Sequence, residues 1–265
     1  MPEAQYLEAV RKNYSKAGTA LIEQLYGDNF LSLSGECSSD NIIRHTNINT
    51  DTRLLDIGSG VGGPAIYFAQ KTGCTVTGVD IVEWNVDEAN KRSRLARVDD
   101  KVAFQVGDAT SLTFDSGTFD VAISQDAWCH IPEKRRVISE AVRMVKSGGF
   151  VAFTDWIELS EMESKYLAEV QTAVAAANFS KPQCYKNWLL EEGCTIISII
   201  DISQHFADRY RTMISNLKLI KSEIVQKYNQ NIFSIILEKN ELILQAFTDG
   251  KIGGTEIVAQ KQSYK

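Results

Sequence analysis

The sequence has no hydrophobic run that approaches the ~20 residues needed to cross a bilayer. Its first residues, MPEAQYLEAVRKN, contain no apolar core segment, so a signal peptide is not expected. Lysine and arginine total 28 against 34 acidic residues, a net charge of −6 that lacks the basic excess of nucleic-acid-binding proteins. We therefore expect a cytoplasmic protein that binds neither a membrane nor nucleic acid.

Cysteine and histidine are also scarce, with five and three residues. The cysteines form no CxxC pair and show no metal-ligand spacing, which favours reduced thiols and gives no reason to expect a bound metal. The remaining composition, 44% apolar and 23% charged, is that of an ordinary globular chain. At 265 residues it can bury a full core without disulfides.

Short β-rich runs recur between helical patterns. They occupy residues 53–58, 74–80, 102–108, 119–124, 150–155, 195–200 and 256–260. The first five lack clean polar–apolar alternation, which indicates parallel strands buried on both faces. Strands that alternate with helices predict right-handed crossovers and a doubly wound α/β sheet.

The spacing between strands widens after the fifth strand, so additional helices are expected there. Residues 206–224 carry apolar side chains at helical spacing, a pattern that fits either a lid over the sheet or ordinary core packing. We expect a helical lid over 1–50, a cofactor-binding Rossmann-like core over 51–158, and helical cap insertions plus the last two strands over 159–265. The sequence leaves a homo-oligomer open.

The strongest motif is LLDIGSGVGG, Leu54 to Gly63, between an apolar strand and a helix. Glycine lets the backbone take left-handed angles and lets a ligand approach closely. Asp56 precedes the first glycine, Asp80 ends the next strand and Asp108 ends the third. Three carboxylates therefore surround the loop, with Asp80 placed to bind ribose hydroxyls.

Two cofactor classes use such a loop. A dinucleotide needs backbone amides facing a pyrophosphate, and an acid in front of the loop would repel that anion. Asp56 instead favours the cationic amino-acid part of S-adenosylmethionine. The alternative is that these acids have only a structural role, as turn or capping residues.

The run LLDIGSGVGG…GVD…GD…FDVAISQDAWCHI…VKSGGFVAFTD resembles the class I S-adenosylmethionine-dependent methyltransferases over residues 52–155. The resemblance implies seven strands in the order 3-2-1-4-5-7-6, the seventh antiparallel. It also implies that the glycines contact the methionine part, and that Ile81 and Ala109 flank the adenine. The expected cofactor-binding residues are Asp56, Gly58, Ser59, Gly60, Gly62, Asp80, Ile81, Asp108, Ala109 and Gln125.

The loop after the fourth strand reads SQDAWCHIPEK, Ser124 to Lys134. It lacks the Asn/Asp-Pro-Pro-aromatic motif of base methyltransferases and is similar to sarcosine/dimethylglycine and phosphoethanolamine N-methyltransferases. In the phosphoethanolamine type a tyrosine of the N-terminal lid pairs with the histidine after this strand. The matching residues are Tyr14 and His130. Gln125 stands where an arginine follows the strand in that family, and 175–185 has no clear phosphate-clamping arginine.

We expect His130, with an ordinary pKa near ~6.5, to take or relay the proton of an amine acceptor. Tyr14 would hold the imidazole, and Asp126 would orient the cofactor or the loop. A histidine at a strand end can also be purely structural. Four aromatic residues at or after strand ends are candidates to hold the acceptor, by cation–π attraction or as apolar walls. They are Trp128, Trp156, Tyr185 and Trp188.

The favoured interpretation is therefore an S-adenosylmethionine-dependent methyltransferase whose acceptor is a small amine. The first alternative is a C- or O-methyltransferase of a larger apolar metabolite or natural product. A catalytically silent cofactor-binding protein and a dinucleotide oxidoreductase are more distant alternatives.

Overall fold

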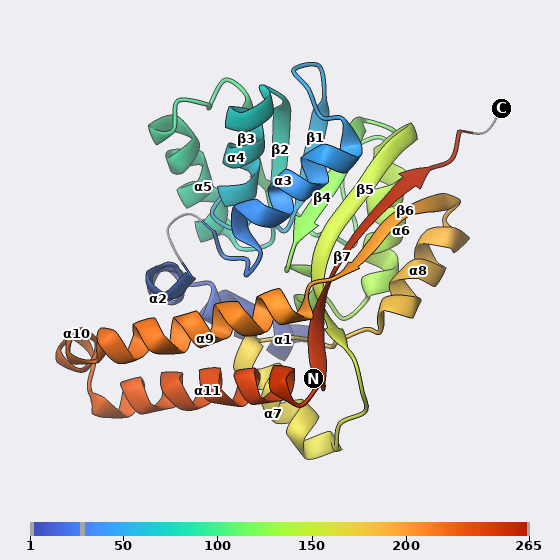
Figure 1. The fold of residues 1–265 in the computed structure, drawn as a ribbon. Coiled ribbons are helices and arrows are strands. Elements are labelled where there is room, and N and C mark those ends of the chain that lie inside the picture. Colours follow the sequence, from blue (N-terminus) through green and yellow to red (C-terminus); the bar gives the residue numbers. More distant parts are fainter. Residues whose placement is uncertain (1–2, 27–29, 264–265) are drawn as a thin grey trace.

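Seven strands form one sheet in the order β3-β2-β1-β4-β5-β7-β6, as predicted (Figure 1). The computed structural model describes residues 3–26 and 30–263, so residues 1–2 and 27–29 of the predicted lid lie outside the described part. The strands are β1 Arg53–Ile57, β2 Thr75–Asp80, β3 Val102–Val106, β4 Phe119–Gln125, β5 Val145–Glu158, β6 Cys194–Asp201 and β7 Ile252–Lys261. The first five are parallel, and β7 pairs antiparallel with both β5 and β6.

The fifth strand is much longer than the predicted 150–155. It begins at Val145, which pairs with Phe119 before a register shift, and it runs on to Glu158 opposite Ile252 of β7. The segment Lys146–Gly149 contains no apolar residue, so the sequence pattern missed the start of the strand.

Helices cover both faces of the sheet, and adjacent strand residues point to opposite sides. Leu54 packs in the core with α3 (Gly35–Thr46), α4 (Gly63–Thr72) and α5 (Glu83–Leu95). Leu55 packs in a second core with α6 (Lys134–Met144) and α8 (Pro182–Glu191) on the opposite face. Both residues are fully buried, which explains why the strands lack polar–apolar alternation.

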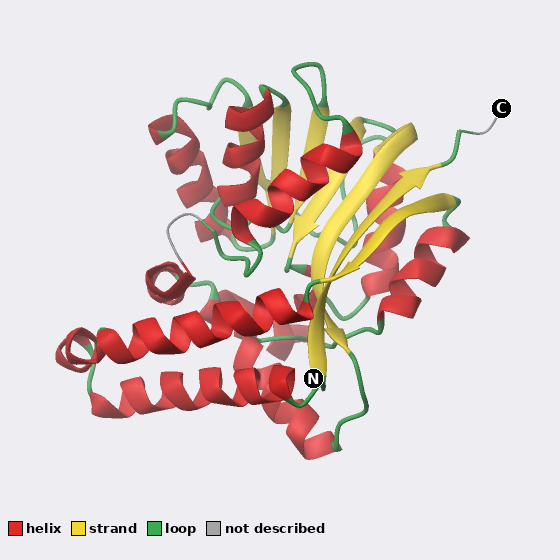
Figure 2. Cartoon of the chain, in the orientation of Figure 1, coloured by secondary structure: helices red, strands yellow, loops and turns green. Residues whose placement is uncertain are grey.

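The remaining helices gather at one end of the sheet (Figure 2). They are α1 Glu3–Asn13, α2 Lys16–Tyr26, α7 Ser164–Val174, α9 Ser203–Leu219, α10 Lys221–Lys227 and α11 Gln230–Thr248. The predicted stripe over 206–224 falls on α9 and α10, two helices that meet at Ile220, and its members Phe206, Met213 and Leu217 are buried. No helix of the described residues has the length and apolar character to span a bilayer.

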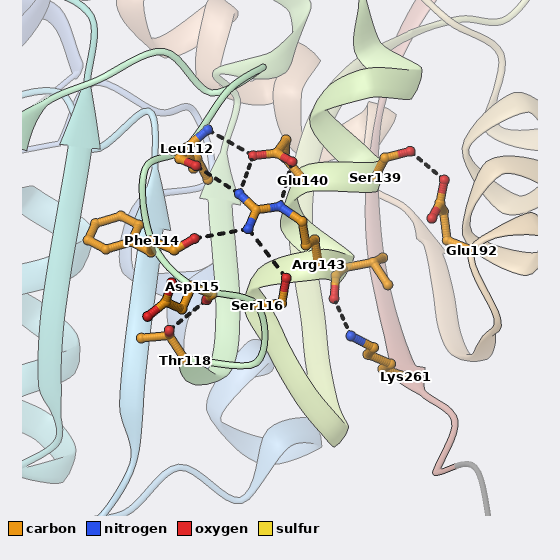
Figure 3. A network of polar contacts seen from close by, with 11 residues as sticks. Leu112, Phe114, Asp115, Ser116, Thr118, Ser139, Glu140, Arg143, Glu192 and Lys261 are labelled. Atoms are coloured by element: carbon orange, nitrogen blue, oxygen red, sulfur yellow. Dashed lines mark hydrogen bonds and ion pairs between the residues drawn. The ribbon is translucent and has the colours of Figure 1, made fainter.

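The loop between β3 and β4 is fixed by a single arginine of α6 (Figure 3). The Arg143 guanidinium donates to the carbonyl oxygens of Leu112 at 2.7 Å and Phe114 at 2.9 Å. It also forms a bidentate pair with Glu140, whose carboxylate accepts the Leu112 N–H at 2.8 Å. Arg143 and Glu140 together hold the middle of the loop that begins with Gly107 and Asp108.

Candidate active site

The glycine loop connects β1 to α4 at the carboxyl end of the sheet. Gly58, Gly60 and Gly62 have φ values of +84°, +51° and +88°, which L-residues with side chains rarely adopt. A Cβ on Gly58 would lie 2.5 Å from the Cβ of Ala127, and one on Gly60 would lie 3.1 Å from Leu31. Glycine at these two positions therefore lets Ala127 and Leu31 lie against the loop.

Asp80 closes β2 directly beside this loop. Its carboxylate accepts the backbone N–H of Gly60 and of Val82, each at 2.8 Å. Desolvation raises the pKa of Asp80, and these hydrogen bonds to the charged form oppose the rise. The acid therefore braces the loop while it also lines the cavity described next.

A cavity of about 410 Å³ lies over these strand ends. Of the predicted cofactor-binding residues, those that line it are Gly58, Gly60, Asp80, Ile81, Asp108, Ala109 and Gln125. Asp108 Oδ1 accepts the N–H of Thr110 at 2.8 Å and its hydroxyl at 2.7 Å, so this acid also builds the local turn. Asp56, Ser59 and Gly62 do not line the cavity.

Asp56 lies beneath the glycine loop rather than at its mouth. Its side chain is buried, and its Oδ2 has no hydrogen-bond partner among the described residues. Burial, followed by the nearby charge of Asp80, raises its pKa to about 8. The expectation that Asp56 meets the cationic end of a ligand directly is not supported by this position.

Gly62 is explained by packing between elements. A Cβ there would lie 2.6 Å from the ring of Phe104 and 3.1 Å from Ala89. The glycine therefore lets α4 approach β3 and α5 closely, and the loop's third glycine needs no ligand contact to account for it.

Gln125 and Asp126 fasten the N-terminal segment to the end of β4. The Gln125 side chain accepts from the Ser32 hydroxyl at 3.0 Å and donates to Ser39 Oγ at 2.8 Å. Asp126, at φ +55°, accepts the Leu33 N–H at 2.7 Å and the Thr154 hydroxyl at 2.6 Å. Burial raises the pKa of Asp126 to about 7 despite these bonds.

The predicted pair of Tyr14 and His130 is in contact. The Tyr14 hydroxyl lies 2.7 Å from His130 Nε2, and His130 Nδ1 lies 2.9 Å from the carbonyl oxygen of Ala175. A carbonyl only accepts, so Nδ1 carries the proton and Nε2 of the neutral ring accepts from Tyr14. The histidine is thus held from both sides, by α1's C-terminal extension and by the residue after α7.

His130 is a much weaker base than the sequence suggests. Burial lowers its pKa to about 4, helped by the positive charge of Lys134 and opposed by the bond to Ala175. The expected pKa near ~6.5 is therefore wrong for the structure as described. The ring is neutral throughout the ordinary pH range.

Three of the four aromatic candidates pack in the core or against it and line neither cavity. Trp128 and Tyr185 are fully buried and pack against Phe153, with ring centroids 4.4 Å and 5.4 Å away. Trp188 packs edge-on against Tyr185 at 5.6 Å. In the 3₁₀ turn Trp128–His130, the Trp128 side chain points towards α6 and α8, and the His130 side chain points towards the helical layer. Trp128 therefore cannot reach the cavities that His130 lines.

Trp156, the fourth candidate, lines a second cavity of about 180 Å³. Most of its walls come from the segment after α1 and from helices α2, α7, α9 and α11, and they include Leu25, Met213 and Ile243. Four residues line both cavities, namely Tyr14, Leu31, Asp126 and His130. The two spaces therefore meet at the Tyr14–His130 pair.

Sequence reasoning missed several lining residues. Those of the first cavity include Leu7, Val10, Asn85, Thr110 and Pro132, and those of the second include Leu21, Ile22, Ile236 and Asn240. Asn85 and Thr110 lie within five residues of a strand end that carries a predicted acid, and that proximity was a usable signal. The lining residues that come from separate helices carry no such signal in the sequence, because helical spacing does not tell which face of a helix lines a cavity.

Comparison with known proteins agrees with this architecture. Residues 55–153 match a family described as a methyltransferase domain. The chain is 29% identical to 27-O-demethylrifamycin SV methyltransferase of Amycolatopsis mediterranei, over 82% of this chain and 85% of that protein. It is 27% identical to sarcosine/dimethylglycine N-methyltransferase of Halorhodospira halochloris, over 62% of this chain and 58% of that protein. It is 30% identical to sterol 24-C-methyltransferase of Kluyveromyces lactis, over 58% and 43%.

Solved structures share the fold at low identity. Phosphoethanolamine N-methyltransferase 2 of Haemonchus contortus, in complex with S-adenosyl-L-methionine, superimposes with a TM-score of 0.87 at 24% identity, over 96% of this chain and 59% of that one. A putative sarcosine dimethylglycine methyltransferase of Galdieria sulphuraria gives 0.79 at 18% identity, over 86% and 85%.

The strand order and the glycine loop define an α/β protein that binds a nucleoside-type cofactor. Residues 55–153 match a methyltransferase domain, and the strand order, the relatives and the solved structures agree with a class I S-adenosylmethionine-dependent methyltransferase that takes its methyl group from S-adenosylmethionine.

Proposed function

We propose that the larger cavity holds S-adenosylmethionine. Gly58 and Gly60 line this cavity with bare backbone that a ligand can approach closely, and Asp80 offers its carboxylate to the ribose hydroxyls. Ile81 and Ala109 would flank the adenine, and Asp108 would meet its amino group. The bound cofactor supplies a methyl group on a positively charged sulfur, which needs positioning and dry surroundings more than acid–base help.

The acceptor occupies the second cavity with an apolar body and presents its nucleophile at the Tyr14–His130 pair. The observation that carries this proposal is the shared lining of the two cavities, because only there can an atom face both spaces. Leu, Ile, Val, Met and Trp side chains form most of the second cavity's walls. A relative that methylates a rifamycin and another that methylates a sterol support an apolar acceptor.

The pair contributes a proton path and a fixed wall. A nucleophile that loses a proton can pass it to the Tyr14 oxygen while that hydroxyl gives its own proton to His130 Nε2. The depressed pKa of His130 makes the protonated ring short-lived, so positioning of the acceptor is the pair's larger contribution. Asp126 holds Leu33 and with it the segment that closes the second cavity.

A small amine is the second candidate, and one observation favours it. Asp126 lines both cavities beside the pair, and a cationic amine or its methylated product would favour the ionised form of its carboxyl and be attracted to it. Relatives that methylate sarcosine and dimethylglycine support this alternative. Against it, the described lining of the second cavity includes one lysine, Lys239, and no arginine to bind a phosphate or carboxylate bidentately.

Transfer of a tritiated methyl group to matched panels would separate the two. One panel contains phenols and hydroxylated polycyclic compounds, and the other contains glycine, sarcosine, dimethylglycine and phosphoethanolamine. We expect turnover with the apolar panel. Turnover confined to the amines would overturn the first proposal in favour of the second.

Calorimetry tests the cofactor cavity separately. S-adenosylhomocysteine should bind to the wild-type protein, and NADH should not. Binding of NADH alone would contradict the assignment of the cavity.

A further inference from the structure

Helices α9, α10 and α11 form an antiparallel hairpin that extends away from the sheet (Figure 1). Lys218 of α9 pairs with Glu241 of α11 at 3.0 Å, so α10 and the first turns of α11 form the far end of the hairpin. We call residues 218–235 the hairpin tip. None of the tip residues lines either cavity.

The hairpin tip exposes large hydrophobic side chains. Leu219 is 83% exposed, and Tyr228, Ile232 and Ile235 are 36 to 41% exposed. These are four of the eleven large hydrophobic residues that are exposed in the described part of the chain. Ile232 and Ile235 are three residues apart on α11 and therefore share one face of that helix.

The same segment is basic in an acidic protein. Its charged residues are Lys218, Lys221, Lys227 and Glu223, while the whole chain has a net charge of −6. Lys221 Nζ lies 5.3 Å above the ring of Phe233, and Lys227 Nζ lies 5.2 Å above the ring of Tyr228. Neither lysine forms an ion pair within the part of the chain that the structure describes.

Contrary to the expectation from the sequence that the protein binds no membrane, we propose that the hairpin tip docks on the surface of an anionic lipid bilayer. Exposed leucine and isoleucine enter the boundary between headgroups and acyl chains, tyrosine lies at that boundary, and lysines attract anionic headgroups. A second copy of the chain is the less suitable occupant, because a two-fold contact would place the lysine-rich tips against each other. The contact is peripheral and leaves the fold unchanged.

This contact would bring the acceptor cavity close to the membrane. Tyr210 and Met213 of α9 and Ile236 of α11 line the second cavity and lie on the same two helices that carry the tip. If the acceptor is apolar, as proposed above, it partitions into the bilayer, and docking shortens its route to the cavity. The docking itself does not depend on the acceptor's identity.

Vesicle flotation of the full chain tests the docking without any acceptor. We expect the wild type to float with vesicles that contain one third phosphatidylglycerol, and to bind pure phosphatidylcholine at least tenfold more weakly. Leu219→Ser combined with Ile235→Ser should lower the partition coefficient about tenfold. Lys221→Gln and Lys227→Gln should each lower it roughly fivefold, with less effect at high salt.

Leu95→Ser is the matched control, since Leu95 is 74% exposed at the end of α5, away from the tip. It should float like the wild type, and all variants should keep wild-type thermal unfolding and affinity for S-adenosylhomocysteine. No flotation of the wild type, or an equal loss with Leu95→Ser, would overturn the docking. A tip-dependent dimer in light scattering without vesicle binding would assign the tip to a second copy instead. If the wild type did not bind S-adenosylhomocysteine, that result would count against the proposed function and not against the docking.

Discussion

The Tyr14 hydroxyl donates a 2.7 Å hydrogen bond to His130 across 116 residues of sequence. Their rings meet edge to face, with centroids 5.2 Å apart. The bond joins the N-terminal helices to the turn after β4 at the point where the two cavities meet. It therefore ties the N-terminal helices to the position in which we propose that the acceptor reacts.

Tyr14→Phe removes this bond and leaves the ring in place. We expect turnover with the acceptor found in the panels to fall about 10- to 100-fold, because the imidazole loses its orienting donor and the acceptor loses its proton path. Affinity for S-adenosylhomocysteine should stay within twofold by calorimetry. A parallel loss of cofactor affinity would make the pair a structural brace of the cofactor cavity.

The buried His130 should make the free energy of unfolding depend on pH. Its pKa is about 4 in the folded protein and ~6.5 when unfolded, so between these values the unfolded chain binds the additional proton. Stability from the neutral, buried ring is complete above pH ~6.5 and is lost at about 1.4 kcal/mol per pH unit as the pH falls towards 4.

Urea unfolding of the wild type and of His130→Asn between pH 4.5 and 7.5 would measure this effect. The asparagine can still donate to Ala175, and the raised pKa values of Asp56 and Asp126 are present in both proteins, so their contributions largely cancel in the difference. The wild type should lose stability relative to the variant on acidification. Parallel curves would show that His130 titrates as an exposed histidine does.

The main effect of Asp80→Asn should be weaker binding of the cofactor. The substitution removes the charge that braces Gly60 and that we assign to the ribose hydroxyls, and hydrogen bonds to a charged group contribute about 1.5–3 kcal/mol. Affinity for S-adenosylhomocysteine should fall roughly 10- to 100-fold in calorimetry. Asp87→Asn, at an exposed position on α5, is the control and should bind like the wild type. An unaltered affinity in Asp80→Asn would refute the ribose role.

Lys134 is a buried lysine that fixes the segment carrying Ala175. Its Nζ donates to the carbonyl oxygen of Asn178 at 2.7 Å, and its charge faces the buried Asp155. Lys134→Met would leave Asp155 without that charge, so we expect a loss of about 3 kcal/mol in the free energy of unfolding. Lys146→Met removes a surface pair with Asp120 and should cost less than about 1 kcal/mol. Similar losses in both variants would contradict a special role for the buried lysine.

The sheet could be predicted from sequence because its strands are buried on both faces. Unbroken apolar runs between helical patterns mark such strands, and the order followed from the resemblance carried by the glycine loop. The start of β5 escaped detection because Lys146–Gly149 has no apolar signal of its own and lies at the register shift between the pairs Phe119–Val145 and Val121–Phe150.

Most of the predicted site residues follow a strand end, and Tyr14 was predicted only through the resemblance to phosphoethanolamine N-methyltransferases. Asp80, Asp108 and Asp126 were predicted together because the carboxyl ends of parallel strands meet at one edge of a sheet, and all three line the larger cavity. Trp128 was misplaced because a single 3₁₀ turn decides which side chain faces the core. The second cavity depends on how separate helices pack, and no local pattern encodes that arrangement.

Trp156 offers the sharpest test of which aromatic residue faces the acceptor. It is buried between Phe206, Tyr210 and Phe247 and lines the second cavity, whereas Trp188 packs against Tyr185 on the other face of the sheet. Trp156→Phe keeps an aromatic ring but enlarges the cavity, so the acceptor loses contact area. We expect the acceptor's KM to rise about fivefold while affinity for S-adenosylhomocysteine is unchanged.

Trp188→Phe is the matched substitution and should change the acceptor's KM less than twofold, because no atom of Trp188 lines either cavity in the described structure. Thermal unfolding of both variants separates a pocket effect from a loss of packing. If Trp188→Phe raised the KM and Trp156→Phe did not, the acceptor would bind on the α8 side of the sheet. Of the four aromatic residues that the sequence suggests as acceptor contacts, Trp128, Tyr185 and Trp188 would then be favoured over Trp156, and the second cavity would have another use.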